Sequence, residues 1–380
     1  MRFEKKALAA LERCYAVSTL FIRGKKHFVV ASEKDFPCLL LDEHGAFVEQ
    51  VWPGEPGGTM SLVPSETGDG SFLATWQFYS PNDSKQARIV RAAPRPDGGW
   101  AVATLARLPH VHRFDVLRRG GVSYMIACTI CSGRDYKDDW SHPGKVYACA
   151  LPDDLSAAGQ AHPLAFETLS EGMFKNHGYL RCHKNGAPAA LVTCESGVYR
   201  YTPPAAPGGA WEVEHLLEEP VSDVCLVDFD GDGVEEMVTI GPFHGDTLQI
   251  YKRDGGVYRK IYTHPKPLPF AHAIWGGLLC GRPAAVIGCR GGARELCCFT
   301  GSESDGFHCQ VIEKMRPPKA CHGFTLAELD TRSKYGVTVI GVLSPGEPFE
   351  YASPQTRVDA NDIIIVSGDA ELLEQFAQMP

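Results

Sequence analysis

The loop from Asp228 to Glu236 carries the densest group of oxygen ligands in the sequence. Aspartates stand at its positions 1, 3 and 5, a glycine at position 6 and a glutamate at position 9. Hard divalent cations prefer several oxygen ligands, and a tight turn with glycine points alternate carboxylates inward. The spacing predicts a Ca²⁺ or Mg²⁺ site whose ligands are Asp228, Asp230, Asp232, the Val234 carbonyl and Glu236. The alternative is an acidic hairpin turn without an ion.

Four histidines form a second candidate for metal binding. They stand near the first strand or the first loop of four different repeat units, and they are His112, His177, His244 and His272. A ring of neutral imidazoles is a natural site for a transition metal such as Zn²⁺. The alternative is a set of polar residues that line a channel and are bridged by water.

The flanks of these histidines, together with one long connection at 131–145, hold further groups that can transfer protons or bind oxygens. The predicted proton-transfer residues are Asp115, Tyr136, Lys137 and Asp139. The predicted substrate-binding residues are Arg113, His142 and Lys145. Turn capping and surface ion pairing are the alternative roles for all of these side chains.

A loose internal repeat positions these residues. A strand, a turn with glycine and a second apolar strand recur six times between residues 13 and 305, and an aromatic third strand usually follows. A period of roughly 45–65 residues is typical of propeller blades. The first strand of each blade lines the central channel of a propeller, so we expect the four histidines to converge there. The predicted fold class is mainly β: a β-propeller with six recognisable blades and then a small α+β unit.

Composition restricts the class of protein. The chain has 380 residues, a net charge of −9 and no long basic run, which argues against nucleic acid as a partner. The N-terminus is charged and does not read as a signal peptide. No apolar run approaches the length of about 18–20 residues that a membrane span needs. Many of the 14 cysteines lie in apolar strand-like runs, which predicts reduced, buried thiols in a cytoplasmic protein.

The first 300 or so residues resemble a known family. The aspartate loop with its flanking strands is similar to an FG-GAP/VCBS repeat, and the stretch 13–305 resembles VCBS-repeat proteins related to the propeller of aldos-2-ulose dehydratase. The segments that carry the resemblance are 112–115, 136–145, 175–178, 242–246 and the aspartate loop. It implies seven blades, Ca²⁺ or Mg²⁺ in the loop, a histidine-bound Zn²⁺ near the channel, and the loss of water from a keto-sugar.

The pattern changes after about residue 308. The residues from Thr325 to Glu328 match a capping box and predict the start of a helix, and Gly336 is predicted to be its C-terminal cap. Strands at 337–343 and 362–366 and a helix at 370–376 are expected next. This unit resembles a TrkA-C (RCK C-terminal) domain through the segments 326–341, 354–362 and 366–369. The resemblance implies dimerisation, binding of a small ligand or ion, and a link to potassium transport.

These observations predict two domains, an FG-GAP/VCBS-like propeller at 1–308 and a TrkA-C-like regulatory domain at 309–380. The leading hypothesis is a metal-binding propeller that acts as a metal-assisted lyase, a dehydratase of keto-sugars or related carbohydrates, with a ligand-sensing C-terminal domain. The alternatives are a non-enzymatic scaffold or sensor and a regulatory protein of potassium transport. The expected partners are a sugar-like small molecule and a second copy of the chain, bound through the C-terminal domain.

Overall fold

The chain divides into two compact units in the computed structural model. One comprises residues 1–291 and 297–312, and the other comprises 292–296 and 313–380. The predicted domain boundary after residue 308 falls inside the last strand of the propeller. The residues that the structure describes are 3–55, 57–79, 83–136, 138–156, 158–159, 162–314, 324–344, 349–359 and 362–377.

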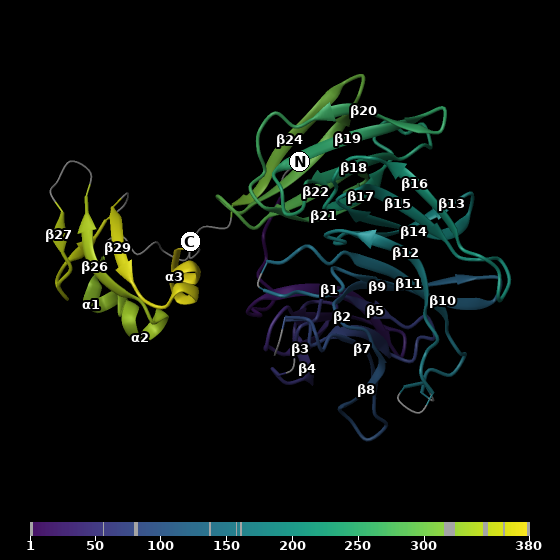
Figure 1. The fold of residues 1–380 in the computed structure, drawn as a ribbon, viewed down its shortest axis with the longest axis horizontal. Helices are drawn as coiled ribbons and strands as arrows, with labels where there is room; N and C mark the ends of the chain where they lie inside the picture. The colour runs from purple at the N-terminus through teal and green to yellow at the C-terminus, as the bar shows by residue number, and fades with distance from the viewer. Residues whose placement is uncertain are drawn as a thin grey trace. The chain divides into compact units, whose positions relative to one another are not determined.

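Six four-stranded sheets make up the first unit within these described ranges, and in each sheet consecutive strands are neighbours (Figure 1). The first two sheets are β1 (Cys14–Ile22), β2 (Lys25–Ser32), β3 (Cys38–Asp42), β4 (Phe47–Trp52) and β5 (Leu62–Pro64), β6 (Phe72–Trp76), β7 (Arg88–Pro94), β8 (Trp100–Arg107). The next two are β9 (Val111–Arg119), β10 (Val122–Thr129), β11 (Gly144–Ala150), β12 (Glu167–Met173) and β13 (Tyr179–Lys184), β14 (Ala187–Cys194), β15 (Gly197–Thr202), β16 (Glu212–Leu217). The last two are β17 (Asp223–Val227), β18 (Glu236–Gly241), β19 (Thr247–Asp254), β20 (Val257–Thr263) and β21 (Ala271–Leu279), β22 (Arg282–Cys289), β23 (Glu295–Ser302), β24 (Gly306–Lys314).

These six sheets are the six units that the sequence repeat predicts, so the prediction of a β-propeller with six recognisable blades is confirmed. The seventh blade that the family resemblance implies is not found among the residues that the structure describes.

Apolar cores hold successive sheets together. One buried cluster joins the first sheet to the second, with Leu20 and Phe72 among its members, and four further clusters join each later sheet to the next. Burying a side chain such as Phe72 stabilises the fold by about 1.5–3 kcal/mol. Interior strands such as β14 and β18 are buried on both faces, which explains their nearly continuous apolar sequences.

The first strand of each sheet lies at the centre. Contacts run from β1 to β5, β9, β13, β17 and β21 in turn. The first and sixth sheets meet through polar and aromatic groups. The rings of Tyr15 and His272 are 5.5 Å apart, and Arg290 donates to both carboxylate oxygens of Glu33 at 2.9 and 3.2 Å. The innermost strands therefore surround one channel.

The second unit is small and mixed. It contains β25 (Phe324–Thr325), α1 (Leu326–Leu329), α2 (Thr331–Tyr335), β26 (Thr338–Leu343), β27 (Glu350–Tyr351), β28 (Arg357–Val358), β29 (Ile363–Ser367) and α3 (Ala370–Ala377). Strands β27, β26 and β29 form one sheet, and β25 pairs with β28.

The single helix predicted from Thr325 to Gly336 is wrong in one respect. Asp330 adopts a left-handed conformation with φ of 45°, which ends α1 and starts α2 as a separate helix. The predicted cap at Gly336 is confirmed, because this residue has φ of 68° and its N–H donates to the carbonyl of Arg332. No helix in the described ranges is both long enough and apolar enough to cross a bilayer.

Candidate metal centre in the propeller channel

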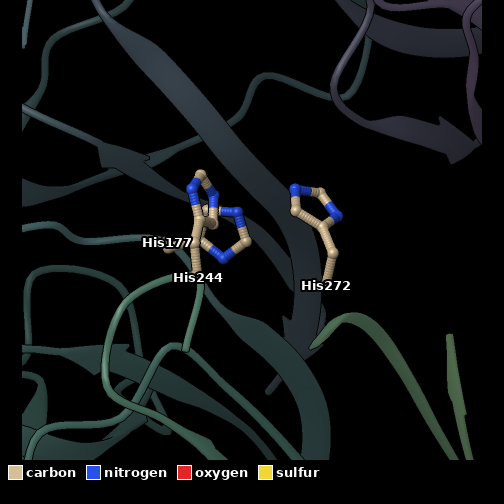
Figure 2. A group of neighbouring side chains, drawn as sticks. All are labelled: His177, His244 and His272. Carbon is tan, nitrogen blue, oxygen red and sulfur yellow. The ribbon is translucent and has the colours of Figure 1, made fainter. Parts of the chain in front are cut away.

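The four predicted histidines converge in the channel. His112 lies on β9, His177 precedes β13, His244 follows β18, and His272 lies on β21. The ring centroids of His177 are 4.8 to 5.1 Å from those of the other three. Figure 2 shows His177, His244 and His272, each of which offers one nitrogen within 4.8 Å of the nitrogens of the other two. A single ion could therefore contact all three.

Glycines permit this close approach. A Cβ at Gly245 would lie 2.6 Å from the carbonyl oxygens of Gly241 and Pro242, so a glycine is needed for the turn that carries His244. Gly178 plays the same part beside His177, because a Cβ there would lie 2.6 Å from a carboxylate oxygen of Asp223. The sequence places both glycines next to a histidine for a steric reason.

A hydrogen bond defines which ring nitrogen of His177 carries the proton. The Nδ1 atom of His177 lies 3.1 Å from the carbonyl oxygen of Ser222. A carbonyl oxygen only accepts, so Nδ1 carries the proton and Nε2 keeps a bare lone pair. This Nε2 is buried and has no hydrogen-bond partner. A buried polar atom without a partner is costly, and a metal ion would satisfy it.

His112 has a different role. Its Nδ1 donates to the carbonyl oxygen of His177 at 3.3 Å, and its Nε2 accepts from the hydroxyl of Tyr15 at 3.3 Å. Both of its nitrogens are thus engaged, and His112 does not belong to the group of three that shares a potential ion position. The structure places it beside the cluster, as a residue that orients Tyr15 and His177.

Burial keeps the imidazoles neutral, which is the form that binds a metal. Burial lowers the pKa of His112 and His177 well below 6.5. It lowers the pKa of His244 to about 4 and that of His272 to about 3, with the charge of Arg290 acting in the same direction. The cluster therefore carries no positive charge of its own at neutral pH.

A cavity of about 480 Å³ adjoins His272. Besides His272, its polar lining includes Tyr15, Arg113, Tyr179, Asp223 and Arg290. This volume is in the range of small-molecule sites. The guanidinium of Arg113, a predicted substrate-binding residue, donates to the carbonyl of Met60 at 2.7 Å and contacts the Tyr15 hydroxyl at 3.4 Å.

Asp223 is a titratable residue that sequence reasoning missed. Its carboxylate lines the cavity and accepts from the N–H of Val224 at 2.9 Å. Burial raises its pKa to about 6, although Arg113 acts in the opposite direction. A carboxyl group with such a pKa suits general acid–base chemistry at neutral pH. The sequence did contain a signal that could have identified this residue. Asp223 begins the first strand of the fifth repeat unit, and first strands carry channel residues in other units.

Asp115 lies in the channel wall but is committed to an ion pair. Arg181 donates to its two carboxylate oxygens at 2.8 and 2.5 Å, and the Tyr179 hydroxyl donates at 3.0 Å. All of these groups stabilise the charged carboxylate. The arrangement favours a positioning role over the proton transfer predicted from the sequence.

The long connection at 131–145 forms a site of its own. Asp139 accepts hydrogen bonds from Ser141 and from the N–H of Asp135, which lower its pKa to about 2. His142 lies 3.3 Å from Asp135 and 3.7 Å from Asp139. Tyr136 is 69% exposed, and Lys137 lies outside the described residues.

Aromatic rings link this connection to the histidine cluster. Trp140 packs on Phe243 at 4.9 Å, and Phe243 stacks on His244 at 3.8 Å. The predicted substrate-binding residue Lys145 lies on β11 and pairs with Glu171 at 2.6 Å. The predicted residues Tyr136, Asp139, His142 and Lys145 thus have local partners or solvent around them.

The aspartate loop lies between β17 and β18, as its flanks predict. Oxygens of Asp228, Asp230 and Glu236 lie within 4.8 Å of one another, a composition that could hold a metal ion. Asp232 lies outside this group and pairs with Lys252 at 2.7 Å, and the side chain of Val234 is exposed.

Comparison with known proteins assigns the C-terminal unit. Residues 312–379 match the model of the TrkA-C domain family. This segment is a TrkA-C domain. No curated protein matches the sequence significantly.

Solved structures support the propeller fold. The β-propeller domain of Cps50 (Swd1) from Myceliophteria thermophila has 10% identity and a TM-score of 0.50, and a protein from Lactobacillus plantarum has 13% identity and a TM-score of 0.53. Each match covers 81% of this chain and 87% of the other. At this identity the likeness concerns the fold alone.

Proposed function

We propose that the propeller is a metal-assisted carbon–oxygen lyase, a dehydratase of keto-sugars or related carbohydrates. The observation that supports this proposal is the group of His177, His244 and His272 beside a polar cavity, with the Nε2 of His177 buried and unpartnered. Three neutral imidazoles with an open fourth position are typical of catalytic zinc sites.

The residues around the cavity suit a dehydration. A divalent metal bound at the imidazoles would supply the Lewis acidity that polarises a carbonyl. Asp223 is placed to accept the proton from the carbon next to that carbonyl, and the electron pair left behind forms a carbon–carbon double bond as the neighbouring carbon–oxygen bond breaks. Arg113, which lines the same cavity, would hold the substrate oxygens.

Tyr15 is the candidate acid for the departing hydroxide. Burial raises its pKa, so the hydroxyl is protonated at neutral pH. Its proton would join the hydroxide and release one water, while the guanidinium of Arg113, which donates to the Tyr15 oxygen, would stabilise the phenolate. Exchange with solvent then moves the proton taken by Asp223 back to Tyr15. The net change is the loss of one water from the substrate.

Metal content tests this proposal first. We expect near-stoichiometric zinc, manganese or iron in the purified wild-type protein and its loss from the double variant His177→Ala/His244→Ala. The matched control is His215→Ala, which removes a histidine that stacks on Tyr199 in the fourth sheet. A wild-type protein that takes up none of these metals, even after incubation with each, would exclude the metal-assisted mechanism.

The substrate class is tested separately. Keto-sugars differing in the hydroxyl next to the enolisable carbon are incubated with the metal-loaded protein, and formation of the conjugated product is followed by absorbance. We expect the product to form with wild type and to be absent with Asp223→Asn. A metal-loaded protein that dehydrates none of the keto-sugars tested would leave only the second candidate function.

The second candidate is a regulatory protein that senses a ligand through the TrkA-C domain, including a role in potassium transport. The family match supports it, and so does an exposed apolar surface on the sheet of β27, β26 and β29. That surface carries Ile340, Tyr351, Ile363 and Ile365, which are 42 to 77% exposed, whereas their neighbours Val339, Ile364 and Val366 pack in the core. Large exposed apolar patches mark interaction sites.

We propose that this surface pairs two copies of the chain. Light scattering after size exclusion tests the pairing, with Ile365→Glu as the disrupting variant and Ser333→Glu, at an exposed position of α2, as its control. We expect dimers of wild type and of Ser333→Glu and monomers of Ile365→Glu. A wild-type monomer at high protein concentration would remove the dimer from the proposal.

A further inference from the structure

A lysine side chain from a neighbouring strand contacts the carboxylates of the aspartate loop. Lys252, on β19, places its ammonium 2.5 Å from Asp230, 2.7 Å from Asp232 and 3.2 Å from Glu236. Its side chain is only 20% exposed. The loop and the lysine are brought together by the sheet, because β18 pairs with both β17 and β19.

Backbone N–H groups donate to the carboxylate oxygens that do not contact Lys252. The N–H groups of Gly231 and Gly233 donate to the two oxygens of Asp228 at 2.8 and 3.1 Å. The N–H groups of Asp232, Val234 and Phe229 donate to Asp230, Asp232 and Glu236 at 3.3, 2.8 and 2.8 Å, on the oxygens that do not face the lysine. Every carboxylate oxygen of these four residues therefore has a donor.

This arrangement is poorly compatible with a divalent ion in the same place. Ca²⁺ needs six to eight oxygens at about 2.3–2.6 Å, and Mg²⁺ needs an octahedral set at about 2.0–2.1 Å. An ion at that distance from Asp230 and Glu236 would meet the ammonium of Lys252 at close range, with like charges and shared ligands. The ammonium and the metal thus compete for one position.

We propose that the ammonium of Lys252 replaces the divalent ion in this loop, so that the turn between β17 and β18 is fastened to β19 without a metal. The sequence of the loop is that of a Ca²⁺ or Mg²⁺ site, but the fold supplies the cation from a neighbouring strand. The proposal concerns a different part of the propeller from the histidine cluster and does not depend on catalysis.

Calcium dependence of stability tests the proposal. Wild type, Lys252→Met and Lys260→Met are freed of metal, and their thermal unfolding is measured in EDTA and in millimolar CaCl₂. Lys260 is the matched control, because it is a lysine on the adjacent β20 that pairs with Glu219 at 2.8 Å. We expect the Tm of wild type and of Lys260→Met to be unchanged by calcium.

Lys252→Met should behave differently. Without the ammonium, four carboxylates repel one another, so its Tm falls in EDTA; calcium then binds the vacated position and raises the Tm by several degrees. Absence of any calcium response in Lys252→Met would overturn the proposal.

A second measurement does not require that variant to fold. Calcium titration calorimetry is performed on wild type and on Asp230→Asn, which removes one carboxylate from the loop. Identical isotherms support the proposal, because no calcium then binds at the loop of the wild-type protein. A calcium-binding heat in wild type that disappears in Asp230→Asn would overturn it.

Discussion

The two predicted metal sites of the propeller differ in whether the protein itself supplies a cation. In the aspartate loop, three carboxylates already face the ammonium of Lys252. In the channel, burial keeps the imidazoles of His177, His244 and His272 neutral, and the Nε2 of His177 is buried without a partner. The first site already contains a cation, the ammonium of Lys252, whereas the second contains neutral imidazoles and one buried nitrogen without a partner.

The difference shows what ligand spacing can and cannot predict. Spacing within one loop indicates that several oxygens will face one point, which holds for Asp228, Asp230 and Glu236. It does not indicate whether a basic side chain from another strand will reach that point first. The unpartnered Nε2 of His177 is therefore better evidence for a metal than the more recognisable aspartate motif.

The largest expected effect separates metal ligands from the residue beside them. His244→Ala removes one of the three proposed ligands, so we expect zinc affinity to fall by more than about 100-fold, whereas His112→Ala removes an orienting partner and should cost roughly 10-fold. Competition with a chromogenic chelator measures both, with His215→Ala as the control. Equal losses in the two variants would contradict the assignment of His112 as a neighbour of the site.

A smaller effect concerns Asp223, whose raised pKa means that its charged form destabilises the folded protein at neutral pH. The folded protein binds its proton up to about pH 6 and the unfolded chain only up to about pH 3.8, so wild-type stability decreases as the pH rises between these values. Asp223→Asn should therefore be more stable than wild type by up to about 3 kcal/mol above pH 6. Near pH 3.5 the difference should vanish.

Urea denaturation at several pH values checks this difference. The same substitution should abolish the proposed dehydration, so stability and activity change in opposite directions. A variant of unchanged stability at pH 7 would show that the carboxyl of Asp223 is not buried as a charged group.

Asp115 is a second acidic residue whose charge is paired with a basic side chain of the protein, here Arg181. Asp115→Asn leaves Arg181 with a weaker partner, and the side chain of Arg181 is 45% exposed, so we expect a loss of about 1–2 kcal/mol in the free energy of unfolding. The folded variant should still bind the metal proposed for the channel. Loss of activity with unchanged stability would instead support the proton-transfer role predicted from the sequence.

The smallest effect is expected for an ordinary surface ion pair. Lys260→Met breaks the contact with Glu219, in which both side chains are more than a third exposed, and should change stability by less than about 1 kcal/mol. Lys252→Met, which empties a position shared by three carboxylates, should cost clearly more in the same chemical denaturation experiment. Equal costs would mean that Lys252 is also only a surface partner.

Much of the propeller could be predicted because its organisation is local. Each sheet is a meander, so strand pairs such as β13 with β14 are close in sequence and leave a pattern of strand, turn and strand. The helix predicted from Thr325 to Gly336 was less successful, because the backbone at Asp330 turns left-handed where the residue type alone does not require it.

The site was predictable only in part. The convergence of His177 and His272 follows from their places near first strands, which share one channel in any propeller. His244 instead reaches the channel from the connection between β18 and β19, the second and third strands of its sheet. Asp115 was recognised as a proton-transfer candidate because it flanks His112, but its partner Arg181 lies in the next sheet. Asp223 was missed because its chemistry comes from burial, which no local pattern displays.

The sequence by itself determined the repeat, the C-terminal domain and the types of ligand at each site, because strand patterns, turns and short motifs depend on neighbours along the chain. Only the tertiary structure decided that Lys252 pairs with three carboxylates of the aspartate loop, that Tyr15 contacts His112, and that Asp223 has a raised pKa. Electrostatic interactions depend on distance through space and on exclusion of water, and both quantities exist only once the sheets have packed around the channel.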